Sequence, residues 1–200
     1  MKKMLQLKTS LFANQGQSSQ LSDAFVAAWQ ASRPGAEVTV RDFAIDPVPH
    51  IDGAGFQAFL SQPDGRTAEQ QAKIDYSDTL IAELQAADVL VIGLPMYNLG
   101  IPSTLKAWID HVARAGITFR YTANGPQGLL AGKQAYVFAT RGGRYAGTAF
   151  DTQTDFIRNF LGFIGITEVE FVYAEGLNMG DESKTAGLAS AHAELTRIAA

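Results

Sequence analysis

The sequence predicts an α/β fold, a three-layer sandwich in which helices cover both faces of a five-stranded parallel sheet. Strand-like and helix-like segments alternate along all 200 residues, which is typical of parallel βαβ units. Two strand-like segments, residues 89–94 and 135–139, are continuously apolar, as strands are when both of their faces are covered. No repeat or linker interrupts this alternation, so residues 1–200 are expected to form a single domain.

The first half of the chain is expected to contribute three strands and three helices. The strands are predicted at residues 4–8, 37–42 and 89–94. Ser18 or Ser19 can cap the first helix, whose apolar residues recur every three to four positions until Gly35 ends it. Between the second and third strands we expect a short helix at residues 56–60. A longer helix follows, and its start is marked by a capping box at residues 67–70.

The second half is expected to contribute two strands and three helices. The strands are predicted at residues 135–139 and 168–173. Pro102 suits the first turn of the first of these helices, the second spans residues 156–164 and is closed by Gly165, and the third spans residues 182–199. The hairpin at residues 118–129 has no obvious core role in such a sheet.

The expected strand order is 2-1-3-4-5. The continuously apolar third and fourth strands fit internal positions, whereas the alternating patterns of the second and fifth strands fit the edges. A six-stranded doubly wound sheet would need one strand more than the sequence shows.

The composition excludes several classes of protein. Hydrophobic residues make up 46% of the chain, which is too many for a mainly disordered protein. Because 16 basic residues face 20 acidic ones without a basic block, no nucleic-acid partner is expected. The lack of cysteine excludes disulfides, thiol catalysis and thiolate metal sites, and three dispersed histidines predict no zinc site. The N-terminal apolar run is broken by Gln6 and Lys8, and no stretch approaches the ~18 apolar residues of a membrane span, so we expect a cytoplasmic protein without membrane association.

Three loops are expected to meet where the strands end. In open parallel sheets, ligands bind outside the carboxyl ends of the strands, at the point where the strand order reverses. The loop at residues 9–19 leads into a helix and is rich in hydroxyls and amides, with one glycine. Free backbone N–H groups at such a helix terminus suit a phosphate, although a serine-rich N-cap is also an ordinary way to begin a helix.

The other two loops follow the two most apolar strands. In residues 95–102, an exposed Met96 and Tyr97 could cover a planar ring while Asn98 bonds its edge; alternatively, both side chains pack on the next helix. In residues 140–143, paired glycines allow the backbone to approach a ligand closely, or form a flexible turn. Three such loops at the ends of central strands favour a ligand site.

Competing motifs fail on their context. Residues 53–58 match G-x-G-x-x-A but do not follow a strand, and residues 128–133 lack the glycine spacing of a P-loop. No G-x-S-x-G elbow is present. We expect His111 to be a surface or dimer-edge residue rather than a base, and Asp110 and Arg114 to form a solvated i, i+4 pair.

The motifs Met96-Tyr97-Asn98 and Thr140-Arg141-Gly142-Gly143 are specific. With them, the chain resembles the bacterial FMN-dependent NADH-azoreductases, also described as FMN-dependent NADH:quinone oxidoreductases. The likeness covers nearly the whole chain. Further matching segments are residues 21–23, 39–42, 113–116, 118–122, 124–126, 160–167 and 174–176.

The resemblance implies a flavodoxin-like fold and a homodimer that binds one FMN per subunit near the dimer interface. It implies that the FMN phosphate is held by Ser10, Gly16, Gln17 and Ser18. It implies that the isoalloxazine lies along Met96, Tyr97, Asn98 and Leu99. It implies that the pyrimidine side of the ring is bonded by Thr140, Arg141, Gly142 and Gly143.

Two positions depart from the family pattern. Leu99 stands where the family has Phe, which removes an aromatic side chain near the flavin and bears on pocket shape and substrate preference. Thr140 replaces a Ser and keeps the hydroxyl. The resemblance also places the hairpin beside the active site, so Tyr121 and Phe163 are candidate walls of the substrate pocket; plain core packing is an equal alternative, especially for Phe163.

The activity implied is ping-pong transfer of two electrons from NADH, by way of FMN, to a quinone or an aromatic azo compound. The chemistry belongs to the cofactor, so no side chain is assigned as acid or base. One alternative is a flavodoxin-like electron carrier without an organic substrate, against which the modest net charge and the long connection 43–87 argue. A second alternative is a non-enzymatic binding module on the same scaffold.

Overall fold

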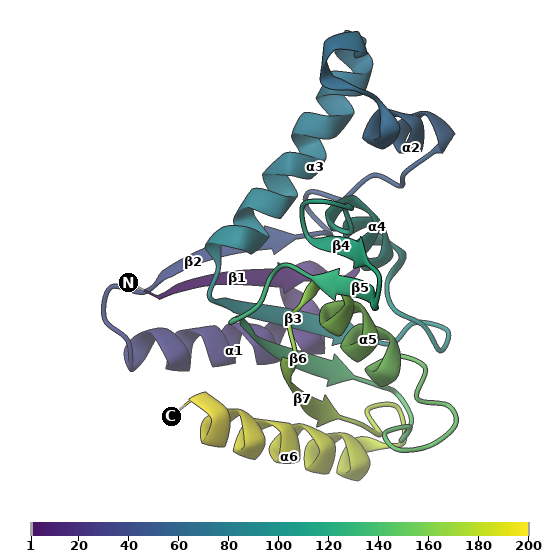
Figure 1. Cartoon of the computed structure of the whole chain (residues 1–200). Helices are drawn as coiled ribbons and strands as arrows, with labels where there is room; N and C mark the ends of the chain where they lie inside the picture. The colour runs from purple at the N-terminus through teal and green to yellow at the C-terminus, as the bar shows by residue number, and fades with distance from the viewer. Residues whose placement is uncertain (1, 200) are drawn as a thin grey trace.

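The predicted strands form one parallel sheet in the computed structural model, which describes residues 2–199 (Figure 1). The strands are β1 (Lys3–Lys8), β2 (Glu37–Asp42), β3 (Val89–Pro95), β6 (Gln134–Thr140) and β7 (Glu168–Ala174). Their order is β2-β1-β3-β6-β7, which confirms the predicted order 2-1-3-4-5. The predicted hairpin is formed by β4 (Phe119–Thr122) and β5 (Gly125–Gly128), which pair outside the main sheet.

Helices cover both faces of the sheet, as expected (Figure 1). One face carries α1 (Gln17–Ala31) and α6 (Asp181–Ala199). The other face carries α3 (Ala68–Ala86), α4 (Ser103–Val112) and α5 (Thr154–Ile164). The helix α2 (Gly53–Leu60) and the first half of α3 project beyond the sheet (Figure 1). Short 3-10 turns lie at Ala13–Gln15 and Pro63–Gly65. Among residues 2–199, no helix is both long and apolar enough to cross a membrane.

The central strands contribute side chains to two hydrophobic cores, one on each side of the sheet. Every residue of β3 is buried, and its side chains alternate between the two sides. Leu90, Ile92 and Leu94 face α3, α4 and α5, whereas Val89 and Val91 face α1 and α6. This double burial fixes the carboxyl ends of β1, β3 and β6 side by side, where the three loops begin.

Two of the predicted helix ends are confirmed and two are wrong. The capping box at residues 67–70 is confirmed, and Gly165 ends α5 with a φ of 103°. The prediction that Ser18 or Ser19 caps α1 is wrong, because Gly16 is the N-cap and both serines lie in the first turn with buried side chains. Likewise, Pro102 is the N-cap of α4 rather than part of its first turn.

The segment 53–58 is part of a helix that begins three residues before the expected start. The Oδ1 atom of Asp52 accepts a hydrogen bond of 2.6 Å from Gly55 N, which caps α2 at its first turn. The segment follows a loop and not a strand, so its resemblance to a dinucleotide fingerprint is coincidental.

The predicted pair between Asp110 and Arg114 does not form. The helix α4 ends at Val112, so Arg114 no longer has an i, i+4 relation to Asp110, which pairs with Lys106 instead. The Arg114 guanidinium is buried, donates to Ser77 Oγ at 2.8 Å, and lies over a phenyl ring of α2.

Candidate active site

The carboxyl ends of β1, β3 and β6 open onto a crevice of about 170 Å³. It is built from the three loops that the sequence singled out. The predicted cofactor residues that line it are Ser10, Gly16, Gln17, Met96, Tyr97, Thr140, Arg141 and Gly142. The predicted residues Ser18, Asn98, Leu99 and Gly143 belong to the same three segments but do not line the crevice itself.

The first loop brings two backbone segments into unusually close approach. A Cβ atom built on Gly16 would stand 2.0 Å from Ser10 Oγ and 2.5 Å from Ser10 Cβ, so only glycine fits there. The Ser10 hydroxyl accepts a hydrogen bond of 3.2 Å from Phe12 N and lies 3.3 Å from the Tyr97 hydroxyl. Ser10 therefore joins the first loop to the loop after β3.

The start of α1 offers hydrogen-bond donors. Within residues 2–199, no side chain caps this helix, so the amides of its first turn are free of such a partner. The hydroxyls of Ser18 and Ser19 are buried and have no hydrogen-bond partner in the described part of the chain. Uncapped amides at a positive helix end, beside unpaired hydroxyls, are the features of an anion site.

The second loop makes a tight turn with a strained backbone. Tyr97 and Gly100 exchange two backbone hydrogen bonds of 3.1 and 3.0 Å around a two-residue turn. The turn residues Asn98 and Leu99 have φ values of 50° and 60°. Left-handed backbone costs of the order of 1–3 kcal/mol per non-glycine residue and persists where the surroundings impose it, frequently at functional sites.

The third loop presents its backbone to the crevice while its arginine turns away. The Arg141 side chain is fully buried and pairs with Asp151 at 2.7 Å and Glu175 at 3.2 Å. Its guanidinium also lies 5.0 Å from the ring centre of Tyr173. Its guanidinium charge is neutralised by these two carboxylates inside the protein, and its backbone N–H donates a hydrogen bond of 2.9 Å to Ala174 O, so Arg141 shapes the third loop.

The buried carboxylate of Asp151 stays ionised. Burial opposes ionisation, but hydrogen bonds from Arg141 and from Thr154 outweigh it, and together they hold the pKa of Asp151 below its ordinary value. The ion pair of Asp151 with Arg141 thus remains formed at neutral pH and fixes the third loop.

Sequence reasoning missed the part of the crevice that comes from the loop after β7. The missed residues are Leu177 and Asn178 of this loop and Lys184 of α6, while Phe12 and Pro95, which also line the crevice, belong to two of the predicted loops. A Cβ atom on Gly142 would lie 2.6 Å from Asn178 Nδ2, so this glycine allows the loop after β7 to reach the crevice. The predicted topology could have indicated this loop, because a fifth strand parallel to β6 ends at the same edge of the sheet.

Tyr121 and Phe163 are brought together, but not at this crevice. Tyr121 is 75% exposed on β4, and Phe163 is half-buried on α5. Both contact the ring of Phe119, with ring centres 5.5 and 4.2 Å away. Neither lines the crevice of this single chain.

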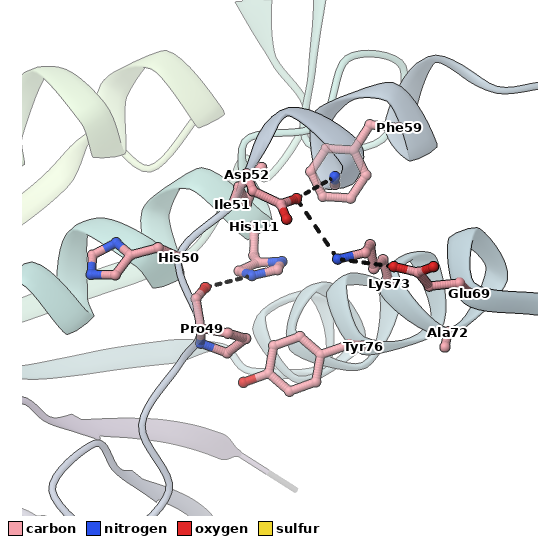
Figure 2. A pocket seen from close by; sticks show the side chains of 11 residues that line it. Pro49, His50, Ile51, Asp52, Phe59, Glu69, Ala72, Lys73, Tyr76 and His111 are labelled. Carbon is pink, nitrogen blue, oxygen red and sulfur yellow. Dashed lines mark hydrogen bonds and ion pairs between the residues drawn. The ribbon is translucent and has the colours of Figure 1, made fainter.

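A second cleft, of about 290 Å³, lies between α2, α3 and α4 (Figure 2). None of the predicted cofactor residues lines it. Across the cleft, Lys73 Nζ stands 3.7 Å from Asp52 Oδ1 and 3.9 Å from Glu69 Oε1 (Figure 2). The helix that starts at this cleft, α2, is capped by Asp52, whereas the start of α1 at the sheet edge has no side-chain cap among the described residues.

The surface position predicted for His111 is wrong. Its side chain is 6% exposed, and its Nε2 lies 3.0 Å from the Pro49 carbonyl oxygen (Figure 2). A carbonyl only accepts, so Nε2 carries a proton and donates it to this bond. Burial lowers the pKa of His111, and the bond to Pro49 only partly opposes this effect.

The crevice defines a class of protein. An uncapped first helix, a glycine beside a serine hydroxyl, and a fixed turn after the central strand are typical of α/β proteins that bind a phosphorylated ligand at the edge of the sheet. A family model described as the flavodoxin-like fold matches residues 2–198, and the chain belongs to this family.

Curated relatives of similar sequence indicate a more specific class within this family. An FMN-dependent NADH:quinone oxidoreductase of Alcanivorax borkumensis is 58% identical over 192 residues, covering 96% of this chain and 97% of that protein. A protein of the same name from Cellvibrio japonicus is 53% identical over 181 residues, covering 90% and 91%. These relatives confirm the resemblance to the FMN-dependent NADH:quinone oxidoreductases.

Solved structures agree over the whole chain. An azoreductase from Bacillus anthracis has a TM-score of 0.91 at 28% identity, covering 100% of this chain and 99% of that one. An FMN-dependent NADH-azoreductase from Bacillus anthracis, solved in complex with FMN, has a TM-score of 0.91 at 26% identity and covers 100% and 98%.

Proposed function

We propose that the chain is an FMN-dependent oxidoreductase that transfers two electrons from NADH to quinones and reductively cleaves aromatic azo compounds. One observation supports this most: the predicted phosphate, ring and diglycine segments meet at a single crevice at the carboxyl edge of the sheet. Two relatives named as FMN-dependent NADH:quinone oxidoreductases are 53% and 58% identical over 181 and 192 residues.

The residues present fit an FMN phosphate. A monoester phosphate carries about −1.5 to −2 charge near neutral pH and needs several donors. The uncapped backbone amides at the start of α1, that of Ser18 included, supply donors among the described residues, and Gly16 leaves room beside Ser10. Gln17, at the first position of α1, adds an amide that lines the crevice.

We assign the isoalloxazine to the other two loops. Met96, Tyr97, Asn98 and Leu99 would lie along the ring, and Thr140 to Gly143 would bond its pyrimidine side. The buried ion pairs of Arg141 leave the backbone of the third loop as the bonding group. Loops tied to rigid strands hold such donors in place before the ligand arrives, which is how a protein tunes a cofactor.

When bound, FMN accepts two electrons as a hydride from NADH and passes them to the acceptor. The chain contributes binding, orientation and a flat apolar wall, and we assign no side chain as acid or base. The exposed Leu99 and Phe12, at 43% and 65%, flank the crevice and suit planar apolar substrates. We propose that NADH and the acceptor occupy this space in turn, which gives a ping-pong scheme.

We further propose a homodimer in the cytoplasm, where NADH is available. Large apolar side chains remain exposed on the projecting α2, with Phe56 at 56% and Leu60 at 62%, and on the hairpin at Tyr121. A second copy would cover them. In that assembly we assign Tyr121 and Phe163 to the wall of the substrate pocket.

One experiment separates the enzyme from the alternatives. The purified chain is loaded with FMN, mixed with NADH, and supplied with benzoquinone or an azo dye. A yellow protein that consumes NADH with these acceptors supports the proposal. A yellow protein that NADH cannot reduce supports the electron carrier, and a protein that cannot be loaded with FMN supports the binding module.

A further inference from the structure

A short segment before α5 holds both ends of the turn after β3. Gln153 is fully buried, and its Nε2 donates hydrogen bonds of 3.0 Å to Pro95 O and of 3.0 Å to Gly100 O. Pro95 is the last residue of β3, and Gly100 closes the turn. One side-chain amide therefore bridges the entrance and the exit of this turn.

The residues next to Gln153 make further contacts with the same turn and with the third loop. The Thr152 hydroxyl donates to the carbonyl of Leu99, one of the two residues of this turn with a left-handed backbone. On its other side, Asp151 is held by the buried Arg141 of the third loop. The segment 151–153 thus connects the turn after β3 to the loop after β6.

The chemistry of these contacts fixes the orientation of the Gln153 amide. Both partners are carbonyl oxygens, which only accept, so the NH₂ end must face them. The Oε1 atom is left buried without a hydrogen-bond partner among residues 2–199. The NH₂ group of Gln153 thus bonds two carbonyls of the turn while its own oxygen stays without a donor, which is unusual for a buried amide.

We propose that Gln153 is a positioning residue that holds the Tyr97–Gly100 turn in its left-handed conformation and thereby sets how the turn meets the flavin. This inference rests on the proposed FMN site. Gln153 does not line the crevice, so it acts on the cofactor only through the backbone it holds. The turn needs such support because Leu99 has a φ of 60°, a conformation that Asn adopts readily but a branched apolar residue such as Leu rarely does.

The test is Gln153→Met, which keeps the length of the side chain but has no donor. In the FMN-loaded protein we expect faster hydrogen exchange at the amides of Tyr97 and Gly100, and an FMN dissociation constant raised roughly tenfold by the loss of two buried hydrogen bonds. We also expect a lower flavin midpoint potential, because ordered N–H donors stabilise the electron-rich reduced state. Gln85→Met, at an exposed position of α3, is the matched control and should match the wild type in all three measurements.

A second variant keeps the inference testable if Gln153→Met does not fold. Thr152→Val is at an exposed position and removes only the bond to Leu99 O, so it should raise exchange in the turn and weaken FMN binding to a smaller degree. Unchanged exchange, affinity and potential in the variants that fold would overturn the positioning role while leaving the FMN site intact. Failure of the wild-type chain to bind FMN would instead overturn the proposed function.

Discussion

The glycine beside the Ser10 hydroxyl gives the sharpest test of the phosphate site. In Gly16→Ala, the new methyl carbon would lie 2.0 Å from Ser10 Oγ and 2.5 Å from Ser10 Cβ, so Ser10 must move. The backbone itself tolerates alanine, because Gly16 has a φ of −70° and a ψ of 134°. The substitution therefore acts through space and not through backbone strain.

The size of the effect follows from the hydrogen bond that a displaced Ser10 could no longer donate to the phosphate. Displacing Ser10 removes its hydroxyl from the crevice, and a hydrogen bond to a charged group contributes about 1.5–3 kcal/mol. Since about 1.4 kcal/mol is a tenfold change in affinity, the FMN dissociation constant should rise roughly ten- to hundredfold. Ser10 also meets Tyr97, so the loop after β3 would be held less firmly.

The assay is titration of the apoprotein with FMN, followed by flavin fluorescence, with thermal unfolding measured in parallel. The control is Gly53→Ala at the first position of α2, where a Cβ atom meets nothing within 4 Å. We expect this control to bind FMN as the wild type does. Equal FMN affinity of Gly16→Ala and the wild type, both folded, would refute the assignment of the phosphate to this loop.

Three further predictions concern stability. The pKa of Asp151 in the folded chain lies below its ordinary value. Its ionised carboxylate therefore contributes to the free energy of unfolding above about pH 4, and this contribution is lost as the pH falls through the folded pKa. Asp151→Asn should lower the free energy of unfolding at pH 7 by roughly 1–3 kcal/mol and flatten this acid dependence in urea titrations; an unaltered acid profile would contradict the pair with Arg141. The lowered pKa of buried His111 means that the unfolded chain takes up a proton first, so stability should fall as the pH drops below about 6.5, and less so in His111→Gln; a His111 NMR titration at or above that pH would disprove this. Gly162→Ala, at an open position of α5, should raise the unfolding temperature by about 2–4 °C, and a decrease would show that the site is crowded.

The parts of the fold that follow from local patterns were predictable. The apolar run of β3, the capping box at residues 67–70 and the glycine that ends α5 are each set by a few adjacent residues. The strand order then followed, because apolar strands must be internal and the crossovers are right-handed. The meeting of the three loops at one edge is a consequence of that topology.

The residues that the sequence misplaced or did not mark depend on partners outside their own segment. His111 and Arg114 are covered by α2, α3 and the loop before α2, and the sequence around α4 does not indicate this burial. Gln153 bonds carbonyls 58 and 53 residues away, and nothing in its own neighbourhood marks it. The cap at Gly16 was missed because the requirement for glycine comes from the approach of Ser10, six residues earlier.

The most direct test of the central claim is a crystal structure of the chain grown with FMN. We expect electron density for the phosphate at the start of α1, against Gly16 and Ser18, and for the ring along Met96 to Leu99. Density for FMN in the cleft between α2, α3 and α4, or a crevice at the sheet edge that stays closed to the ligand, would contradict this claim.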